Sequence, residues 1–469
     1  MTPERNHFLC FNTVDMNPHF LKYDTRLLRN DCLIIRLMKN VPRSSLEKIA
    51  APFHGVTHVK PLFACLLLGA SFLITDAARA QGIERESIAG ESAAGAAHGS
   101  DIDQPYNILL GPVALTATAG FDTTFNDNIN IAHTGRLTDV ILTPSMDVSG
   151  VWQATDLNKL TFDVGIGYNY YTMHSGTSSL VISPDSSTQF NVYVGDFKIN
   201  IHDDFAYLQD PLEVGQLSGI SQFSRFRNVA GIYIDWDLGD VTLSLDYDHT
   251  NLWVFQSSFQ YLTYQADSVT PKITFNLSKT LSVGLSAEFS DTRYDQDVMN
   301  NSTSLSVGPF LTAQINENLA FNAAVGYEFA NYDTGGLSND NSSLGSWYGS
   351  VGLNHRINDV LRETLTAGQE YLPGITSNYT QRVYANYGLT WQATDYLSVG
   401  TSLWWENLDD SDAAVRQTSN RYGVGLNLGY QLNTHASIDA SYQYVLKDCD
   451  QSEFSYYQNQ VTLGFRYQF

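Results

Sequence analysis

Long segments in which apolar and polar residues alternate are the feature that most limits how this chain can fold. One segment runs from Leu160 to Tyr170, a second from Leu319 to Phe329 and a third from Tyr422 to Tyr430. A period of two is typical of a β-strand with one apolar and one polar face. Each segment spans about ten residues, enough for a tilted strand to cross the hydrocarbon core of a membrane. Strands of soluble sheets are usually about five or six residues long.

The segment 459–469 at the end of the chain has the same pattern. Val461, Leu463, Phe465, Tyr467 and Phe469 fall on one face, and Gln460, Thr462, Gly464, Arg466 and Gln468 on the other. This pattern suits a strand that faces lipid, although an edge strand of a soluble sheet can also alternate. The ending in Phe465, Tyr467 and Phe469 resembles the closing strand of bacterial outer-membrane β-barrels. That resemblance implies that these three residues form a signal for the barrel assembly machinery.

Short and long connections follow one another along the chain. Gly239–Asp240 and Asn358–Asp359 are short turns, whereas 331–345 and 408–419 are longer polar loops. Such alternation is typical of a barrel with periplasmic turns, extracellular loops and an even number of strands. The sequence therefore predicts an all-β protein, a closed antiparallel transmembrane β-barrel of about 18 strands over residues 107–469. A count of 16 remains open, because the alternation fails between 203 and 226, and no loop looks long enough to plug the barrel.

Composition supports this fold class and excludes others. The mean hydropathy is −0.18, and no apolar run is long enough for a membrane-spanning helix, which excludes a helical membrane protein. The formal net charge of −23 makes a nucleic-acid partner very unfavourable.

The first 106 residues read as segments outside the barrel. The apolar run 61–75 followed by Ala78-Arg79-Ala80 is typical of a secretory signal, so 38–80 is interpreted as a signal peptide beginning at Met38. Residues 1–37 then precede the true start, and 81–106 form a flexible periplasmic tail. Both termini of the mature chain are expected in the periplasm. Only Cys449 remains after cleavage, which leaves no intramolecular disulfide.

The segment 121–129, Phe-Asp-Thr-Thr-Phe-Asn-Asp-Asn-Ile, resembles the opening of the β-barrel porin family of the second type. The strand 139–146, Asp203-Asp204 and Asp210-Pro211 add weaker similarities, and the resemblance covers about residues 107–469. It implies a bacterial outer-membrane pore, often associated with exopolysaccharide production.

Charged residues on the polar faces are candidates for ion selectivity. An acid recurs near the extracellular end of five strands, at Asp248, Glu288, Glu328, Glu370 and Glu406. An arc of carboxylates would favour cations over anions. By loop symmetry, Arg382 is expected opposite Glu370 and Arg421 opposite Glu406, which equally fits cross-strand ion pairs that only stiffen the wall. The same symmetry places Glu288 and Glu328 opposite Ser304 and Tyr348.

Aromatic residues on the polar faces suggest a second kind of site. Tyr348, Tyr384 and Trp404 would point into the lumen, where they could stack on sugars. No catalytic set is expected, because His202 is assigned to a periplasmic turn and His249 and His355 to the outer face. The sequence also predicts no metal site and no cofactor.

These observations favour a pore for small polar or cationic solutes in the outer membrane of a Gram-negative bacterium. An exopolysaccharide export conduit and a structural anchoring barrel are the alternatives. The expected partners are outer-membrane lipid, lipopolysaccharide, the barrel assembly machinery and the solute or polysaccharide itself; the oligomeric state is left open.

Overall fold

The computed structural model describes residues 106–336, 339–411 and 416–469. The predicted leader, signal peptide and nearly all of the periplasmic tail lie outside these residues. Among the described residues, no helix has the length and apolar character needed to cross a membrane. Within the described residues there are four short 3-10 helices: η2 (Ser175–Thr177), η3 (Pro211–Glu213), η4 (Ser257–Leu262) and η5 (Ser452–Phe454).

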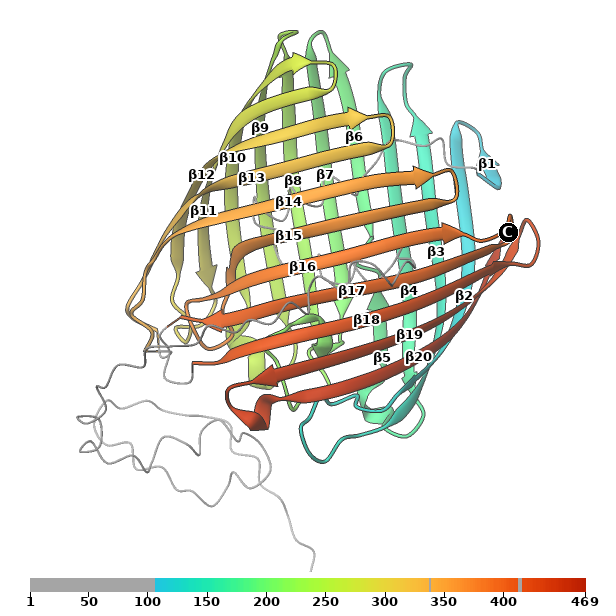
Figure 1. Ribbon diagram of the computed structural model, residues 1–469, viewed down its shortest axis with the longest axis vertical. Helices are drawn as coiled ribbons and strands as arrows, with labels where there is room; N and C mark the ends of the chain where they lie inside the picture. The colour runs from blue at the N-terminus through green and yellow to red at the C-terminus, as the bar shows by residue number, and fades with distance from the viewer. Residues whose placement is uncertain (1–105, 337–338, 412–415) are drawn as a thin grey trace, which may run out of the picture. The chain divides into compact units, whose positions relative to one another are not determined.

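The rest of the regular structure is one antiparallel sheet (Figure 1). Its strands are β1 (Ile108–Leu110), β2 (Val113–Asn126), β3 (Asp139–Gln153), β4 (Lys159–Tyr171), β5 (Ser179–Ile182), β6 (Ser187–Val194), β7 (Phe197–Leu208), β8 (Arg225–Asp237), β9 (Val241–Val254), β10 (Tyr264–Ser278), β11 (Leu281–Tyr294), β12 (Ser302–Asn316), β13 (Leu319–Tyr332), β14 (Leu344–Asn358), β15 (Leu361–Pro373), β16 (Tyr379–Gln392), β17 (Leu397–Asp410), β18 (Thr418–Gln431), β19 (Ala436–Cys449) and β20 (Tyr456–Gln468).

The sheet closes on itself because its first long strand pairs with its last. β2 pairs with β20 from Thr118 opposite Gln468 to Asn126 opposite Gln460. β5 and β6 both pair with β4 and with β7, so together they form a single interrupted strand of the wall. β1 is a short hairpin arm on β2. The result is a closed barrel of 18 strands, which confirms the predicted fold class and rules out the count of 16.

The doubtful stretch 203–226 contains one strand end, one loop and one strand start. The tight turn between β6 and β7 contains Gly195, whose φ of 59° suits a glycine. The segment 209–224 then forms a loop, and β8 begins at Arg225. The alternation fails here because the chain leaves the wall, not because strands are missing.

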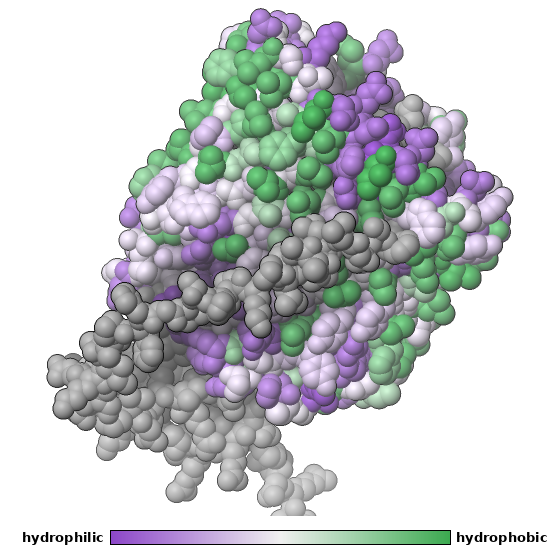
Figure 2. All heavy atoms as spheres, in the orientation of Figure 1, coloured by the Kyte–Doolittle hydropathy of each residue, from purple (hydrophilic) through white to green (hydrophobic). Residues whose placement is uncertain are grey.

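The two faces of the wall follow the sequence pattern. Hydrophobic residues, green in Figure 2, are spread over the barrel surface on the side in view. On β20 the exposed fractions of Val461, Leu463, Phe465, Tyr467 and Phe469 all lie between 42% and 57%. Arg466 points the other way, and its Nη1 lies 2.6 Å from Oδ1 of Asp122 on β2. The predicted faces of the closing strand are therefore confirmed.

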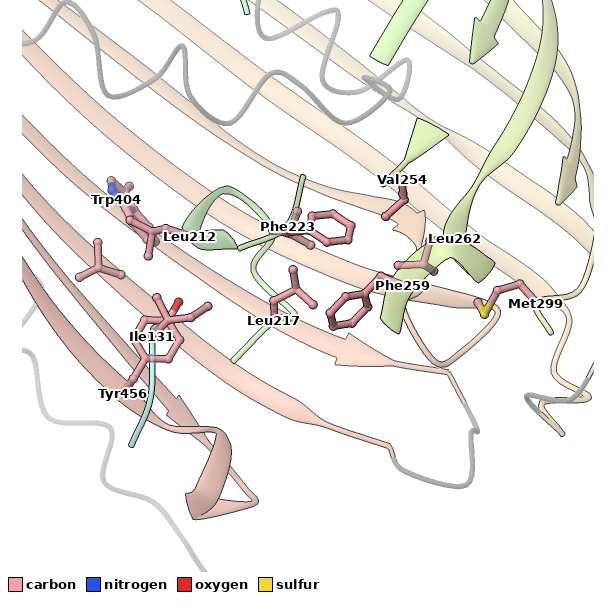
Figure 3. Close-up of a cluster of buried hydrophobic side chains, with 12 residues drawn as sticks. Ile131, Leu212, Leu217, Phe223, Val254, Phe259, Leu262, Met299, Trp404 and Tyr456 are labelled. Atoms are coloured by element: carbon pink, nitrogen blue, oxygen red, sulfur yellow. The ribbon is translucent and has the colours of Figure 1, made fainter. Parts of the chain in front are cut away.

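The connections divide the barrel into two different ends. The loops after β2, β7, β9 and β13 are long, whereas those after β10, β12 and β14 are short turns. Apolar side chains from four loops form a buried cluster with residues of the inner wall (Figure 3). The cluster consists of Ile131, Leu212, Val214, Leu217, Phe223, Val254, Phe259, Leu262, Met299, Trp404, Val445 and Tyr456. Contrary to the expectation from loop length, loop residues therefore occupy part of the lumen at this end of the barrel.

Candidate functional site: a constriction across the lumen

The segment 209–224 between β7 and β8, here called the crossing loop, starts from a rigid base. Asp210 caps η3 by accepting a hydrogen bond of 2.8 Å from the Leu212 N–H. Arg225, the first residue of β8, donates to Glu213 at 2.7 Å and to the Phe223 carbonyl at 3.2 Å. Burial raises the pKa of the Asp210 carboxyl, although the hydrogen bond from Leu212 opposes this shift. These contacts fix the direction in which the loop leaves the wall.

The crossing loop ends its path on strands at the far side of the barrel. Arg421 on β18 donates to the carbonyl of Leu212 at 2.7 Å. Lys447 on β19 donates to the carbonyl of Gln216 at 3.0 Å and to the hydroxyl of Ser218 at 3.1 Å. In the strand order, β18 and β19 lie far from β7 and β8 in either direction around the wall. The loop therefore spans the lumen.

Gly215 permits the close approach of the loop to the wall. A Cβ atom built on this glycine would lie 2.6 Å from Cδ1 of Leu408 and 2.7 Å from Nη1 of Arg421. Figure 3 shows Leu212 beside Trp404, with Leu217 and Phe223 continuing towards Phe259 and Leu262. Apolar packing thus supports the loop where polar contacts do not.

Beneath the loop lies a network of alternating charges. The Glu406 carboxylate accepts from Arg382 Nε at 2.7 Å and makes a very short contact with Arg421 Nη1. Arg382 also donates through Nη1 to Glu370 at 2.9 Å. Glu370 lies opposite Arg382 in the register, and Glu406 lies opposite Arg421. Both predicted cross-strand pairs are confirmed.

The main role of the charge network is to anchor the crossing loop, because its charges are buried and paired rather than open to the lumen. Glu370, Glu406 and Arg421 are each only 3% exposed. Two carboxylates balance two guanidinium groups, and buried charges need such partners because desolvation of an isolated ion is very costly. Arg421 also contacts the Leu212 carbonyl and lies 5.2 Å from the centre of the Trp404 ring, and these contacts tie the network to the crossing loop and its support.

Glu288 and Glu328 lie in a different part of the lumen. Ser306 of β12 lies directly between them, opposite Glu288 on one side and opposite Glu328 on the other. Both carboxylates line a pocket of about 80 Å³ together with Tyr332. The prediction that Glu288 lies opposite Ser304, and Glu328 opposite Tyr348, is wrong by two residues in each case. The registers place Ser306 opposite Glu288, and Ser306 and Ser346 on either side of Glu328.

Asp248, the fifth predicted acid, points into the lumen from β9. Its Oδ1 lies 2.8 Å from Nε2 of His202 on β7. His202 lies within β7 and its side chain faces the lumen, so the prediction that it lies in a periplasmic turn is wrong. His249 and His355 instead contact Asp267 and Glu363 on outward-facing positions, as expected from the alternation.

The three aromatic residues predicted as sugar platforms are buried in the wall. Tyr348 is 2% exposed, Tyr384 4% and Trp404 9%. Each ring lies over a glycine of the neighbouring strand, where a Cβ atom would collide with it: Gly326, Gly368 and Gly423 respectively. Stacking on a sugar requires an exposed ring face. The burial of these residues therefore speaks against the stacking role.

A second buried carboxylate joins three loops at the same end of the barrel. Asp340, in the loop after β13, accepts hydrogen bonds from the Asn378 N–H at 2.8 Å and the Ser411 hydroxyl at 2.5 Å. It also accepts from the Ser342 N–H at 2.8 Å. Burial alone would raise the pKa of Asp340, but these hydrogen bonds outweigh it and hold the pKa below its usual range.

Acidification is expected to release these loops. Because the pKa of Asp340 is lower in the folded protein than in the unfolded chain, its contribution to stability is present at neutral pH. It is lost as pH falls below about 4 and through the lowered folded value. Limited proteolysis of the loops at decreasing pH measures this loss. Asp340→Asn should give proteolysis that is faster at pH 7 and insensitive to pH; a wild-type pH profile in that variant would contradict the assignment.

Comparison with known proteins gives distant structural similarity. No family model matches the chain, and no curated protein matches it. Among solved structures, OccK2 (OpdF) of Pseudomonas aeruginosa in complex with glucuronate is 10% identical, with a TM-score of 0.45 over 77% of this chain and 100% of that one. A BenF-like porin of Pseudomonas fluorescens Pf-5 is 8% identical, with a TM-score of 0.45 over 77% and 100%. OccAB3 of Acinetobacter baumannii is 11% identical, with a TM-score of 0.44 over the same shares.

Proposed function

We propose that this protein is an outer-membrane pore that passes small polar solutes and favours cations. The observation that carries the proposal is the crossing loop inside a closed barrel of 18 strands. Barrels of 16–18 strands are wide enough for an aqueous channel. A loop that crosses the lumen narrows such a channel, which favours small solutes over large ones.

The faces of the wall support a membrane location. Large apolar side chains predominate on the outside, and charged side chains such as Asp122, Arg466 and Asp248 face the lumen. In the proposed orientation the long loops face the exterior, and the short turns and both chain ends of the barrel face the periplasm. The exposed Phe465, Tyr467 and Phe469 then lie at the periplasmic end, where assembly factors would read them.

An exopolysaccharide conduit is less well supported than a solute pore. A polymer has to pass the constriction as an extended chain, and the crossing loop is held there by hydrogen bonds to two strands. The predicted aromatic platforms for sugar are also buried.

Reconstitution in planar bilayers distinguishes a pore from a purely structural barrel. Discrete conductance steps support the proposal, and a protein that inserts without conducting overturns it.

Cation preference is assigned to Glu288 and Glu328. Their separation by Ser306 across adjacent strands places two carboxylates at one height on the lumen wall. Glu288→Gln combined with Glu328→Gln is expected to lower the K⁺ to Cl⁻ permeability ratio by roughly half or more. Reversal potentials in a KCl gradient measure the ratio.

The matched control is Glu363→Gln, which removes a carboxylate that contacts His355 on the outer face. This control should leave the permeability ratio unchanged. Equal permeabilities in the unmodified protein, or equal effects of the two sets of substitutions, would contradict the assignment.

A further inference from the structure

Three side chains that can ligate a metal converge on the lumen wall formed by β7, β8 and β9. His202 comes from β7, and Asp246 and Asp248 come from β9. One ligand atom from each residue lies within 4.8 Å of the other two. Nε2 of His202 and Oδ1 of Asp248 are already 2.8 Å apart. Two ligands on one tetrahedral ion, each about 2.1 Å from it, lie about 3.4 Å apart, so this pair would have to separate by only about 0.6 Å to admit the ion.

Gly231 is the reason that ligands from two non-adjacent strands can meet. It lies on β8 between them, directly opposite His202 on one side and opposite Asp248 on the other. A Cβ atom at this position would lie 2.6 Å from Nε2 of His202 and would collide with the Asp248 carboxylate. The glycine leaves this space to the two side chains.

A hydrogen-bond chain behind His202 orients its ring. Nδ1 lies 3.0 Å from Oδ1 of Asn200, and Nδ2 of Asn200 donates to Oδ1 of Asn191 at 3.1 Å. This amide arrangement makes Oδ1 of Asn200 an acceptor, so Nδ1 of the imidazole carries the proton. Nε2 then faces the carboxylates, where a metal ion would take the place of the proton between Nε2 and Oδ1 of Asp248. Metal-binding histidines are held in this way by a second hydrogen-bonding group.

We propose that His202, Asp246 and Asp248 bind a divalent transition-metal ion of the zinc class inside the barrel. One imidazole and two carboxylates supply nitrogen and oxygen donors whose two negative charges match a divalent ion. Calcium and magnesium prefer oxygen ligands alone, so the imidazole selects against them. Asp204 on β7 and Arg227 on β8 are further charged groups near this cluster.

Zinc binding to the full-length barrel in detergent tests the proposal. After treatment with a chelator and its removal, titration calorimetry with Zn²⁺ should show one strong site per chain. His202→Ala and Asp248→Asn should each weaken binding by roughly a hundredfold, and Asn200→Ala by roughly tenfold, as removal of an orienting group does. His249→Ala is the matched control, because this neighbouring histidine faces outward, and it should bind zinc like the unmodified protein.

Cu²⁺ provides a second, spectroscopic readout. Electron paramagnetic resonance should show coupling to one imidazole nitrogen in the unmodified protein and in His249→Ala, and no such coupling in His202→Ala. The proposal is overturned if the unmodified barrel binds no zinc at millimolar concentration, or if His202→Ala binds it equally well. In that case His202 and Asp248 form only an imidazolium–carboxylate pair of the wall. Conductance is recorded separately, so failure of the metal site leaves the pore proposal intact.

Discussion

Excision of the crossing loop is expected to raise single-channel conductance by roughly threefold or more, because conductance follows the open cross-section of the lumen. The variant replaces residues 211–222 with a short glycine–serine linker, which keeps Asp210 and Phe223 at the wall. The loop makes hydrogen bonds to Arg421 and Lys447 but is not part of a strand. The barrel should therefore still close, and planar-bilayer recording should show the larger steps.

A smaller intervention gives an independent check on the same point. Lys447→Met keeps the length of the side chain but removes the donor to Gln216 and Ser218. We expect the Lys447→Met channel to open intermittently to the conductance of the excision variant. Identical steps in the unmodified protein and the excision variant would show that the narrowest part of the lumen lies elsewhere.

Substitution of Glu406 by glutamine is expected to reduce the free energy of unfolding by about 3–5 kcal/mol, the cost of leaving a buried charge without its partner. Glu406 contacts both Arg382 and Arg421, and all three are held beneath the crossing loop. The change removes one negative charge from a balanced set of four. The melting temperature of the purified barrel, followed by the loss of its compact band in electrophoresis, measures the effect.

The matched control for this substitution is Asp409→Asn on the same strand. Asp409 pairs with Arg416, whose side chain is 55% exposed, and exposed pairs contribute at most about 1 kcal/mol. If both variants lowered the melting temperature equally, the charge network would have no special role in holding the loop.

The sequence predicts the wall well because the wall obeys a simple rule. One face of every long strand meets apolar surroundings and the other does not, so alternation identifies both faces. Closure of β20 on β2 and the pairs Glu370–Arg382 and Glu406–Arg421 follow from that pattern and from short, regular turns. At Glu288 no opposite charge indicates the register, and a symmetric loop is the only guide to it. There the predicted partner is wrong by two residues.

The constriction could not be predicted in the same way, because a loop has no periodic signal. The one available indication is composition: Leu212, Val214, Leu217 and Phe223 are more apolar than a solvated loop requires, and all four are buried. The lumenal cluster was missed for a different reason. Alternation breaks at Gly195–Asp196, and this break predicts a turn that extends to His202, whereas β7 begins at Phe197.

The rings that lie on glycines carry information about assembly. Tyr348 fits over Gly326, and a slip of two residues along β13 would set it against Ala324 or Glu328. Tyr384 fits over Gly368, with Thr366 and Glu370 as the neighbouring alternatives. A slipped strand would keep its apolar face towards lipid, so the membrane could not reject it. The ring-and-glycine pairs favour the observed register, because in a slipped strand each ring would meet a side chain in place of a glycine.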